Sequence, residues 1–245
     1  MTEILPATTR IEGRFNGPNR SGNGGYVAGL VGSRIPGSTG AAATVDLRTP
    51  PPLDHDLGWQ VRGDELDLVD GETVVASGRP GTLDADDPLV AAVDRDLAAA
   101  ARDAYEGYDE HPFPRCFTCG TDREPGDGLR VFSGPLPDGR MACPWVPHEA
   151  FGDAEGLLAP AYTWAALDCP GGWAAHIKEK PMVLARMTAA LYRRPRIGEE
   201  CVVLGALRGV ERRKNHAATA LYAADGELLG RAEQIWITID IAEFA

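Results

Sequence analysis

The segment RSGNGGYVAGLVG, Arg20 to Gly32, joins a loop-like beginning to a helical pattern. Six of its thirteen residues are Gly or Asn, which favour turns. The apolar residues behind its first glycine pair have helical spacing: Tyr26, Val27, Leu30 and Val31. We therefore predict a helix from about Gly24 to Arg34 that begins on Gly24 and Gly25.

The glycines of this segment suggest two uses. The first N–H groups of a helix have no intrahelical acceptor and lie at the positive end of its dipole. Because Gly24 and Gly25 have no side chains, a substrate oxygen can approach these donors closely. Gly29 and Gly32 would let the helix pass close to a neighbour. The alternative is that all four serve only a tight loop and a packing face.

The composition is that of a soluble globular protein. The chain has 245 residues, 44% hydrophobic and 24% charged. It contains no apolar run of about 18 residues, so we expect no membrane span. The N-terminus lacks a basic stretch followed by an apolar one, so we expect a cytoplasmic protein. The net charge of −12 argues against nucleic acid or an anionic membrane as partner.

The order of predicted elements divides the chain into two copies of one plan. Residues 1–87 contain the glycine-led helix and strand-like runs at 41–49, 58–70 and 72–83. Residues 88–115 read as an Ala-rich helix starting at Pro88 and a Pro-rich linker. Residues 116–245 contain a hairpin around 137–139, one apolar helix from Pro160 and three long strands. The predicted class is α+β, each half having a helix and antiparallel strands.

Three stretches together resemble the hotdog-fold acyl-CoA thioesterases. HPFPRCFTCGTDREPGDGLRVFSG (111–134) is similar to the segment C-F-x-C-G-x-x-N-P-x-G-L that opens many of these proteins. NGGYVAGL (23–30) resembles the family's H/Q/N-G-G helix start, and WAALDCPGGWA (164–174) resembles its A-x-L-D carboxylate segment. With two copies in one chain, the resemblance is to a double hotdog, in which two long helices lie on a curved antiparallel sheet.

The resemblance implies an activity and its partners. The substrate would be an acyl-CoA or acyl-carrier thioester, with coenzyme A entering as part of the substrate and no cofactor required. It allows a homo-oligomer of double-hotdog chains. Within the same fold, a hydratase or dehydratase would need a His–Asp pair, and none of the five histidines falls on a predicted helix start. A non-catalytic acyl-CoA or lipid-binding protein is the alternative from another class.

In that family the catalytic acid follows the second Gly by seven positions and serves the site of the opposing copy. Seven positions after Gly25 is Gly32, which has no side chain. The same count from Ala161, the residue opposite Gly25, reaches Asp168. Pro160 removes an N–H from the second helix start. The chain thus predicts one complete site and one dead site.

In the complete site, the resemblance assigns the general base to Asp168 and the oxyanion donors to Gly24 and Gly25. Asn23 would orient the carbonyl or the water. The alternative for Asp168 is an Asp that caps the chain reversal before CPGG, and for Asn23 simple turn chemistry.

Further residues are expected to bind the substrate. Tyr26 and the hydroxyl-bearing Tyr162 and Thr163 lie on the two helices, although such groups are often satisfied locally. Basic clusters near strand ends would bind the coenzyme A phosphates, unless they are only solvated surface: Arg193, Arg194, Arg212 and Arg213.

The cysteines leave a metal question open. Cys116 and Cys119 have C-x-x-C spacing, but no second C-x-x-C exists. Candidates for completing a zinc site are Cys143 with His111 or His148. We expect structural cysteines and no metal.

Overall fold

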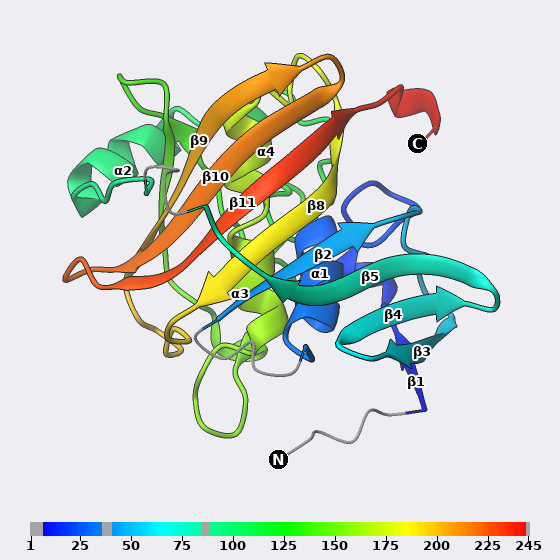
Figure 1. The fold of residues 1–245 in the computed structure, drawn as a ribbon. Coiled ribbons are helices and arrows are strands. Elements are labelled where there is room, and N and C mark those ends of the chain that lie inside the picture. Colours follow the sequence, from blue (N-terminus) through cyan, green and yellow to red (C-terminus); the bar gives the residue numbers. More distant parts are fainter. Residues whose placement is uncertain (1–6, 36–40, 85–88, 244–245) are drawn as a thin grey trace.

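The computed structural model describes residues 7–35, 41–84 and 89–243. Within these ranges the strands form one eleven-stranded antiparallel sheet in the order β1-β3-β4-β5-β2-β8-β11-β10-β9-β7-β6 (Figure 1). The strands are β1 (Thr8–Arg10), β2 (Ala42–Leu47), β3 (Asp56–Arg62), β4 (Glu65–Asp70), β5 (Thr73–Gly81), β6 (Gly134–Pro135), β7 (Met141–Trp145), β8 (Met182–Leu191), β9 (Cys201–Glu211), β10 (Lys214–Ala223) and β11 (Leu228–Thr238).

The sheet changes from early to late strands at a single place. β2 pairs with β8, and Val45 stands opposite Met187 there. Every strand on the β2 side comes from residues 8–81, and every strand on the β8 side comes from residues 134–238. The order β1-β3-β4-β5-β2 on one side corresponds, element by element, to β7-β9-β10-β11-β8 on the other.

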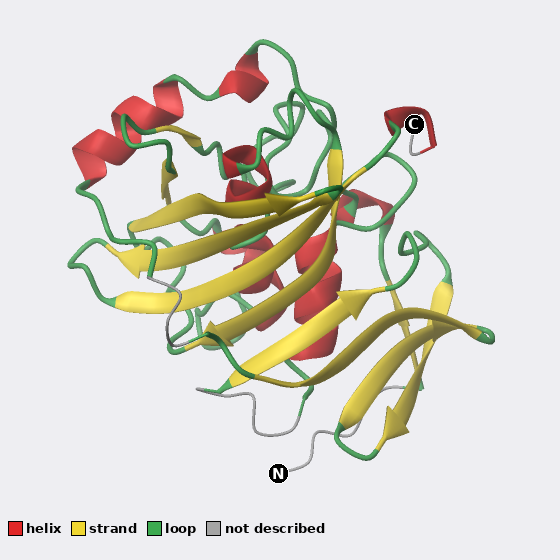
Figure 2. Cartoon of the chain, turned by 45° about the horizontal axis from the view of Figure 1, so that its top comes forward, coloured by secondary structure: helices red, strands yellow, loops and turns green. Residues whose placement is uncertain are grey.

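Three short helices cover one face of this sheet (Figures 1 and 2). They are α1 (Gly24–Gly32), α3 (Pro160–Ala166) and α4 (Cys169–Ala174). A Cβ built on Gly29 would lie 2.7 Å from the Cα of Ala161 and the Cβ of Trp164. The glycines inside the predicted helix therefore do allow α1 to press against α3. None of the helices in the described ranges is long and apolar enough to cross a membrane.

The prediction of one long second helix is wrong. Its sequence forms α3 and α4, which are separated at Leu167 and Asp168. Pro170, near the start of α4, has no N–H to donate to the preceding turn, so the first helix cannot continue through it. This break lets side chains from outside the two helices form hydrogen bonds with the backbone around Asp168.

The segment expected to link the two copies packs against the sheet. Its helix, α2 (Arg95–Asp103), contacts β6 and β7 and is capped by the Asp94 side chain, which accepts from the Leu97 N–H. Pro88 itself lies outside the described residues, but residues 89–94 are not helical, so the helix begins later than predicted, at Arg95. Of the hairpin predicted around 137–139, the first strand is reduced to the short β6, which pairs with β7.

A buried carboxylate ties the early and late strands together. Asp46 on β2 is 5% exposed and pairs with Arg79 on β5 and Arg186 on β8. Burial alone would raise the pKa of Asp46, but hydrogen bonds from Arg186 and Arg79 outweigh it and hold the pKa below its usual value. The ionised carboxylate is therefore the form that the folded state prefers.

Replacing Asp46 with Asn should lower the free energy of unfolding at pH 7 by about 1–3 kcal/mol. Because the folded pKa lies below the unfolded one, the stabilisation is present above the unfolded pKa and disappears as pH falls through the folded pKa. Thermal unfolding of both proteins from pH 7 down to pH 3 should therefore show converging Tm values. Asp56→Asn is the matched control, since its pair with Arg10 is exposed and should matter little. A Tm difference independent of pH would contradict the assignment.

Candidate active site

The break between α3 and α4 places Asp168 against the start of α1. The side chain is 1% exposed, and its Oδ2 accepts from the Gly25 N–H at 3.0 Å and from Asn23 Nδ2 at 2.9 Å. Asn23 is also the N-cap of α1, because its Oδ1 accepts from the Tyr26 N–H at 2.8 Å. The structure thus brings together the Asn23-Gly24-Gly25 turn and the acid that the sequence pointed to.

Gly25 is required by the closeness of this contact. A Cβ built on it would lie 2.3 Å from the Cβ of Asp168 and 2.8 Å from its Cγ. No side chain fits there while Asp168 keeps its position. The N–H of Gly25 is engaged by the carboxylate, while Gly24, the first residue of α1, lines the adjoining cavity.

The two oxygens of Asp168 differ in their surroundings. Oδ2 is held by two donors, whereas Oδ1 is buried and has no hydrogen-bond partner among the residues that the structure describes. Burial, followed by the nearby Cys116, raises the pKa of Asp168 to about 7, against the lowering effect of its hydrogen bonds. The carboxyl group therefore exchanges its proton near neutral pH, as a general base should.

A buried glutamine fixes the backbone at the break. Gln234 on β11 donates from Nε2 to the carbonyl oxygens of Leu167 at 2.6 Å and Asp168 at 3.1 Å. Its Oε1 accepts from the Trp236 indole at 2.8 Å. Sequence reasoning missed this residue. The available signal was an amide at an inward position of a strand, between Ala232 and Trp236, both of which are buried.

A mostly apolar cavity of about 230 Å³ adjoins Asp168. Asn23, Gly24 and Asp168 are among the residues that line it. The apolar wall comes from the loop after α4, from β2, and from the adjacent ends of β8 and β11, and includes Leu47, Ile177, Met182, Leu184 and Trp236. The arrangement can hold an apolar group with a polar atom next to the carboxylate.

His111 also lines this cavity, which the sequence did not indicate. Its Nδ1 accepts from the Phe113 N–H at 2.9 Å, so its Nε2 carries the proton and donates to the Cys119 carbonyl at 3.1 Å. Burial lowers the pKa of His111. The imidazole is therefore neutral with both nitrogens occupied.

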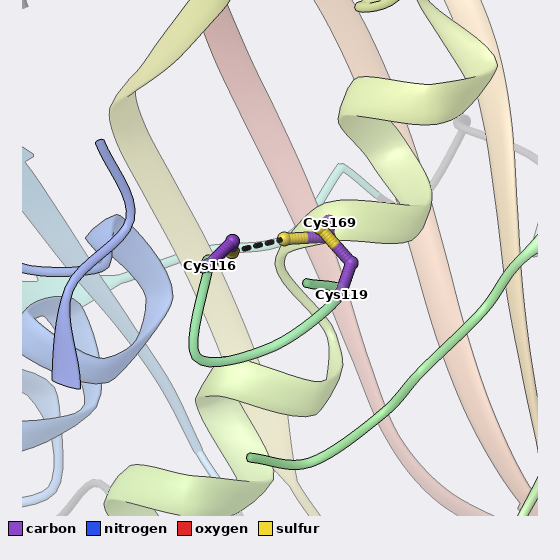
Figure 3. A group of neighbouring side chains, drawn as sticks. All are labelled: Cys116, Cys119 and Cys169. Carbon is purple, nitrogen blue, oxygen red and sulfur yellow. Dashed lines mark hydrogen bonds between the residues drawn. The ribbon is translucent and has the colours of Figure 1, made fainter. Parts of the chain in front are cut away.

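Three cysteines meet in one group (Figure 3), and Cys169, a member of it, follows Asp168 in the chain. The Sγ atoms of Cys116, Cys119 and Cys169 all lie within 4.8 Å of one another, and the expected zinc candidates Cys143, His111 and His148 are not in the group. A zinc site needs four ligands. A fourth ligand atom could come from Asp168, whose Oδ2 lies 3.9 Å from Cys169 Sγ. This oxygen already accepts hydrogen bonds from Asn23 and Gly25. The absence of a bound metal stays a prediction.

The predicted substrate-binding residues on the helices lie elsewhere. Tyr26 and Tyr162 stack on each other with ring centroids 5.8 Å apart, and neither lines the cavity beside Asp168. They belong to an aromatic cluster with Phe15, Phe117 and Phe151. Thr163 Oγ1 donates to the Ala159 carbonyl at 3.4 Å, one turn back. These side chains serve packing in the structure.

The basic clusters separate into two places. Arg193 and Arg194 line a second cavity of about 270 Å³, together with Gly32, Pro160 and Trp164. Both arginines are paired with carboxylates there. This cavity lies at the opposite ends of α1 and α3 from Asp168, where a Cβ on Gly32 would be 2.6 Å from the Trp164 ring.

Arg212 and Arg213 form the turn between β9 and β10. Arg213 donates from Nε and Nη2 to the Thr238 carbonyl at 3.1 and 3.0 Å. Thr238 follows Ile237, which lines the cavity of Asp168. Arg213 therefore contacts the end of β11 next to a residue of the cavity wall, whereas Arg193 and Arg194 line the second cavity.

No protein-family model and no curated protein matches the sequence. The fold, however, is similar to solved thioesterase structures over nearly the whole chain. A putative thioesterase II from Thermobifida fusca matches with a TM-score of 0.61 at 13% identity, covering 98% of this chain and 96% of that one. An acyl-CoA thioesterase II from Mycobacterium marinum matches with a TM-score of 0.58 at 12% identity, covering 97% and 95%.

A third similar structure is described as having a hotdog fold. A protein of unknown function with a hotdog fold from Alicyclobacillus acidocaldarius matches with a TM-score of 0.53 at 15% identity, covering 95% of this chain and 92% of that one. At these identities the agreement concerns the backbone alone. The chain described here has the hotdog fold.

Proposed function

We propose that this protein is an acyl-CoA thioesterase with one working site, built around Asp168. The observation that carries the proposal is the asymmetric environment of the carboxylate. Gly25 and Asn23 hold Oδ2, whereas Oδ1 is buried without a hydrogen-bond partner in the part of the chain that the structure describes, and Asp168 lines an apolar cavity. A buried acceptor normally has a partner, and a water molecule on Oδ1 would provide it. Such a water would be positioned for attack on a thioester.

The reaction follows from this placement. The ionised Asp168 accepts a proton from the water as its oxygen bonds to the thioester carbon. The carbonyl oxygen becomes an oxyanion, which a backbone donor at the start of α1 stabilises; Gly24 is the candidate because the Gly25 N–H is engaged by Asp168. The C–S bond then breaks, and the coenzyme A thiolate takes the proton back from Asp168. The acyl group occupies the apolar part of the cavity.

The repeated strand order supports a double hotdog with a boundary between residues 88 and 115. In this view the cavity beside Arg193 and Arg194 is the counterpart of the working site. Gly32 stands there in place of an acid, Pro160 offers no N–H, and Trp164 occupies the space. The second site is therefore expected to be inactive.

The alternatives make different demands on the cavity. A hydratase or dehydratase would need a histidine free to transfer a proton, and both ring nitrogens of His111 are engaged by backbone groups. A non-catalytic binding protein would retain acyl-CoA without releasing a thiol. Incubation with a series of acyl-CoA thioesters, followed by detection of free coenzyme A thiol, separates these functions. Binding without thiol release for every acyl chain would overturn the proposal.

We expect the cluster near the cavity to bind the nucleotide part of coenzyme A. Replacing Arg212 and Arg213 together by Gln should raise KM for acyl-CoA about 3–10-fold and leave kcat nearly unchanged, because the guanidinium groups would meet phosphates and not the reacting carbon.

Two controls make this test specific. The same acyl group on pantetheine should show no change in KM, since it lacks the nucleotide. Arg193→Gln is the matched variant at the second cavity and should leave KM for acyl-CoA as it is. An equal loss with the pantetheine thioester would contradict phosphate binding.

A further inference from the structure

Three thiols converge on the wall of the candidate active site from two parts of the chain. Cys116 and Cys119 belong to one turn, and Cys169 is the first residue of α4 (Figure 3). Cys116 Sγ and Cys169 Sγ are 3.7 Å apart, and all three cysteines line the cavity beside Asp168. This contact spans 53 residues of sequence, so it is created by the fold.

The three thiols are not equivalent. Asn23 Nδ2 donates to Cys116 Sγ at 3.7 Å. Hydrogen bonds from the Cys119 and Cys169 thiols lower the pKa of Cys116, whereas burial raises the pKa values of the other two. Cys116, whose sulfur also accepts from Asn23 Nδ2, is thus the cysteine whose ionised form its surroundings favour. A thiolate beside a second thiol is the arrangement of a cysteine that can be oxidised reversibly.

We propose that this cysteine group is an oxidation site, where hydrogen peroxide joins Cys116 to Cys169 in a disulfide and switches off the site of Asp168. The formation of the disulfide depends on the cysteines alone, whereas the loss of hydrolysis rests on the proposed function.

The chemistry balances with peroxide as the only oxidant. The Cys116 thiolate attacks one peroxide oxygen, so an S–O bond forms, the O–O bond breaks and hydroxide leaves. The product is a sulfenic acid. The Cys169 sulfur then attacks the Cys116 sulfur, forming the S–S bond and breaking the S–O bond. The hydroxide that leaves Cys116 takes up the proton of the Cys169 thiol and becomes water. One peroxide and two thiols give one disulfide and two waters.

The disulfide would disturb Asp168 directly. An S–S bond is about 2.05 Å long, so the two sulfurs must come closer by more than 1 Å. Cys169 follows Asp168 in the chain, and the carboxylate depends on hydrogen bonds of 2.9 and 3.0 Å to Asn23 and Gly25. Displacing a catalytic group by about 1 Å can lower a rate about 10²-fold. Reduction should restore the original contacts.

Peptide mapping tests the cross-link without any assay of activity. Trypsin releases residues 116–123 with Cys116 and Cys119, and residues 141–178 with Cys143 and Cys169. Cys143→Ala removes the ambiguity in the second peptide. Cys143 is buried on β7 outside the cysteine group, and burial raises its pKa to about 12. After peroxide treatment of this variant, we expect the two peptides to be joined, and separated again by dithiothreitol.

Variants of the pair test specificity. Cys169→Ser should give no joined peptide, and oxidation of Cys116 should then stay within residues 116–123, as a bond to Cys119 or as sulfinic acid. Each variant is compared with its own reduced form, after circular dichroism confirms that it is folded. Hydrolysis by the Cys143→Ala protein should fall at least tenfold with peroxide and return with dithiothreitol.

Distinct results would overturn the proposal. A bridge within peptide 116–123 would assign the disulfide to Cys116 and Cys119. The group would be a metal site if the protein bound one zinc ion per chain and peroxide released the zinc without forming the joined peptide. A joined peptide without loss of hydrolysis would remove the switch. If the joined peptide forms but no acyl-CoA is hydrolysed by the reduced protein, the oxidation site stands and the proposed function fails.

Discussion

Replacing Asp168 with Asn should lower kcat for acyl-CoA hydrolysis about 10²–10⁴-fold while KM changes little. Asn keeps the size of the side chain and can still accept from Gly25 and Asn23, but it cannot take a proton from water. Steady-state kinetics with detection of the free thiol measures both constants. Wild-type kcat in this variant would show that Asp168 is not the base.

The pH dependence of the wild-type rate provides a second check. Burial is the largest cause of the raised pKa, which is about 7, and the neighbouring Cys116 adds to it. Because the base acts only when ionised, kcat should increase with pH and level off above that value. Cys116→Ser should move the midpoint to lower pH. A rate that does not change between pH 5 and 8 would exclude a base with this pKa.

Replacing Asp168 with Asn should also stabilise the protein at alkaline pH. The pKa of Asp168 is about 7 in the folded chain, above the usual 3.8 that applies when it is unfolded. The folded state therefore binds the proton more tightly, and stability is lost as pH rises from the unfolded pKa to the folded one. Asn does not titrate. The Tm of Asp168→Asn should exceed the wild-type Tm by a growing amount between pH 5 and 8, corresponding to roughly 2–3 kcal/mol.

Part of the fold and of the site could be predicted from local features of the sequence. The helix start on Gly24 and most of the long strands could be predicted, since their signals are local periods and turn residues. The run expected over 58–70 is instead a hairpin of β3 and β4, and β1 was not predicted. The meeting of Gly25 and Asp168 was reached by counting along two similar helices. The two residues meet although the second helix is broken, because Leu167, the C-cap of α3, keeps helical backbone angles up to Asp168.

Other parts of the site depend on contacts that no local pattern encodes. His111 and Cys116 reach the cavity because the segment 111–120 folds back beside α1, where the Phe117 N–H donates to the Asn16 carbonyl at 2.7 Å. Hydrophobic periodicity does not predict the path of a segment without regular secondary structure. The position of Tyr26 in an aromatic cluster could not be predicted for the same reason. An aromatic residue on a helix can face a cavity or a cluster, and here the partners come from distant parts of the chain, Phe15 and Phe117.

The smallest change with a large expected effect is Gly25→Ala. Its new Cβ would lie 2.3 Å from the Cβ of Asp168 and 3.1 Å from the Cα of Ala165, so backbone must move. We expect kcat/KM to fall at least about 10²-fold, because the carboxylate loses its place on the Gly25 N–H. The free energy of unfolding should fall by about 1–3 kcal/mol from overpacking. Gly209→Ala on β9 is the control, because nothing lies within 4 Å of its Cβ.

A double variant shows whether the clash with Asp168 causes these losses. Asp168→Gly removes the Cβ that the new methyl group of Gly25→Ala would meet. The stability losses of the two changes should then be less than additive, by about 1 kcal/mol or more, as expected for residues in direct contact. Denaturant unfolding of the two single variants and the double variant measures this coupling. Strict additivity, or wild-type kcat/KM in Gly25→Ala, would mean that Gly25 and Asp168 do not meet in the working protein. In that case the Gly25 N–H and the acid would belong to different sites.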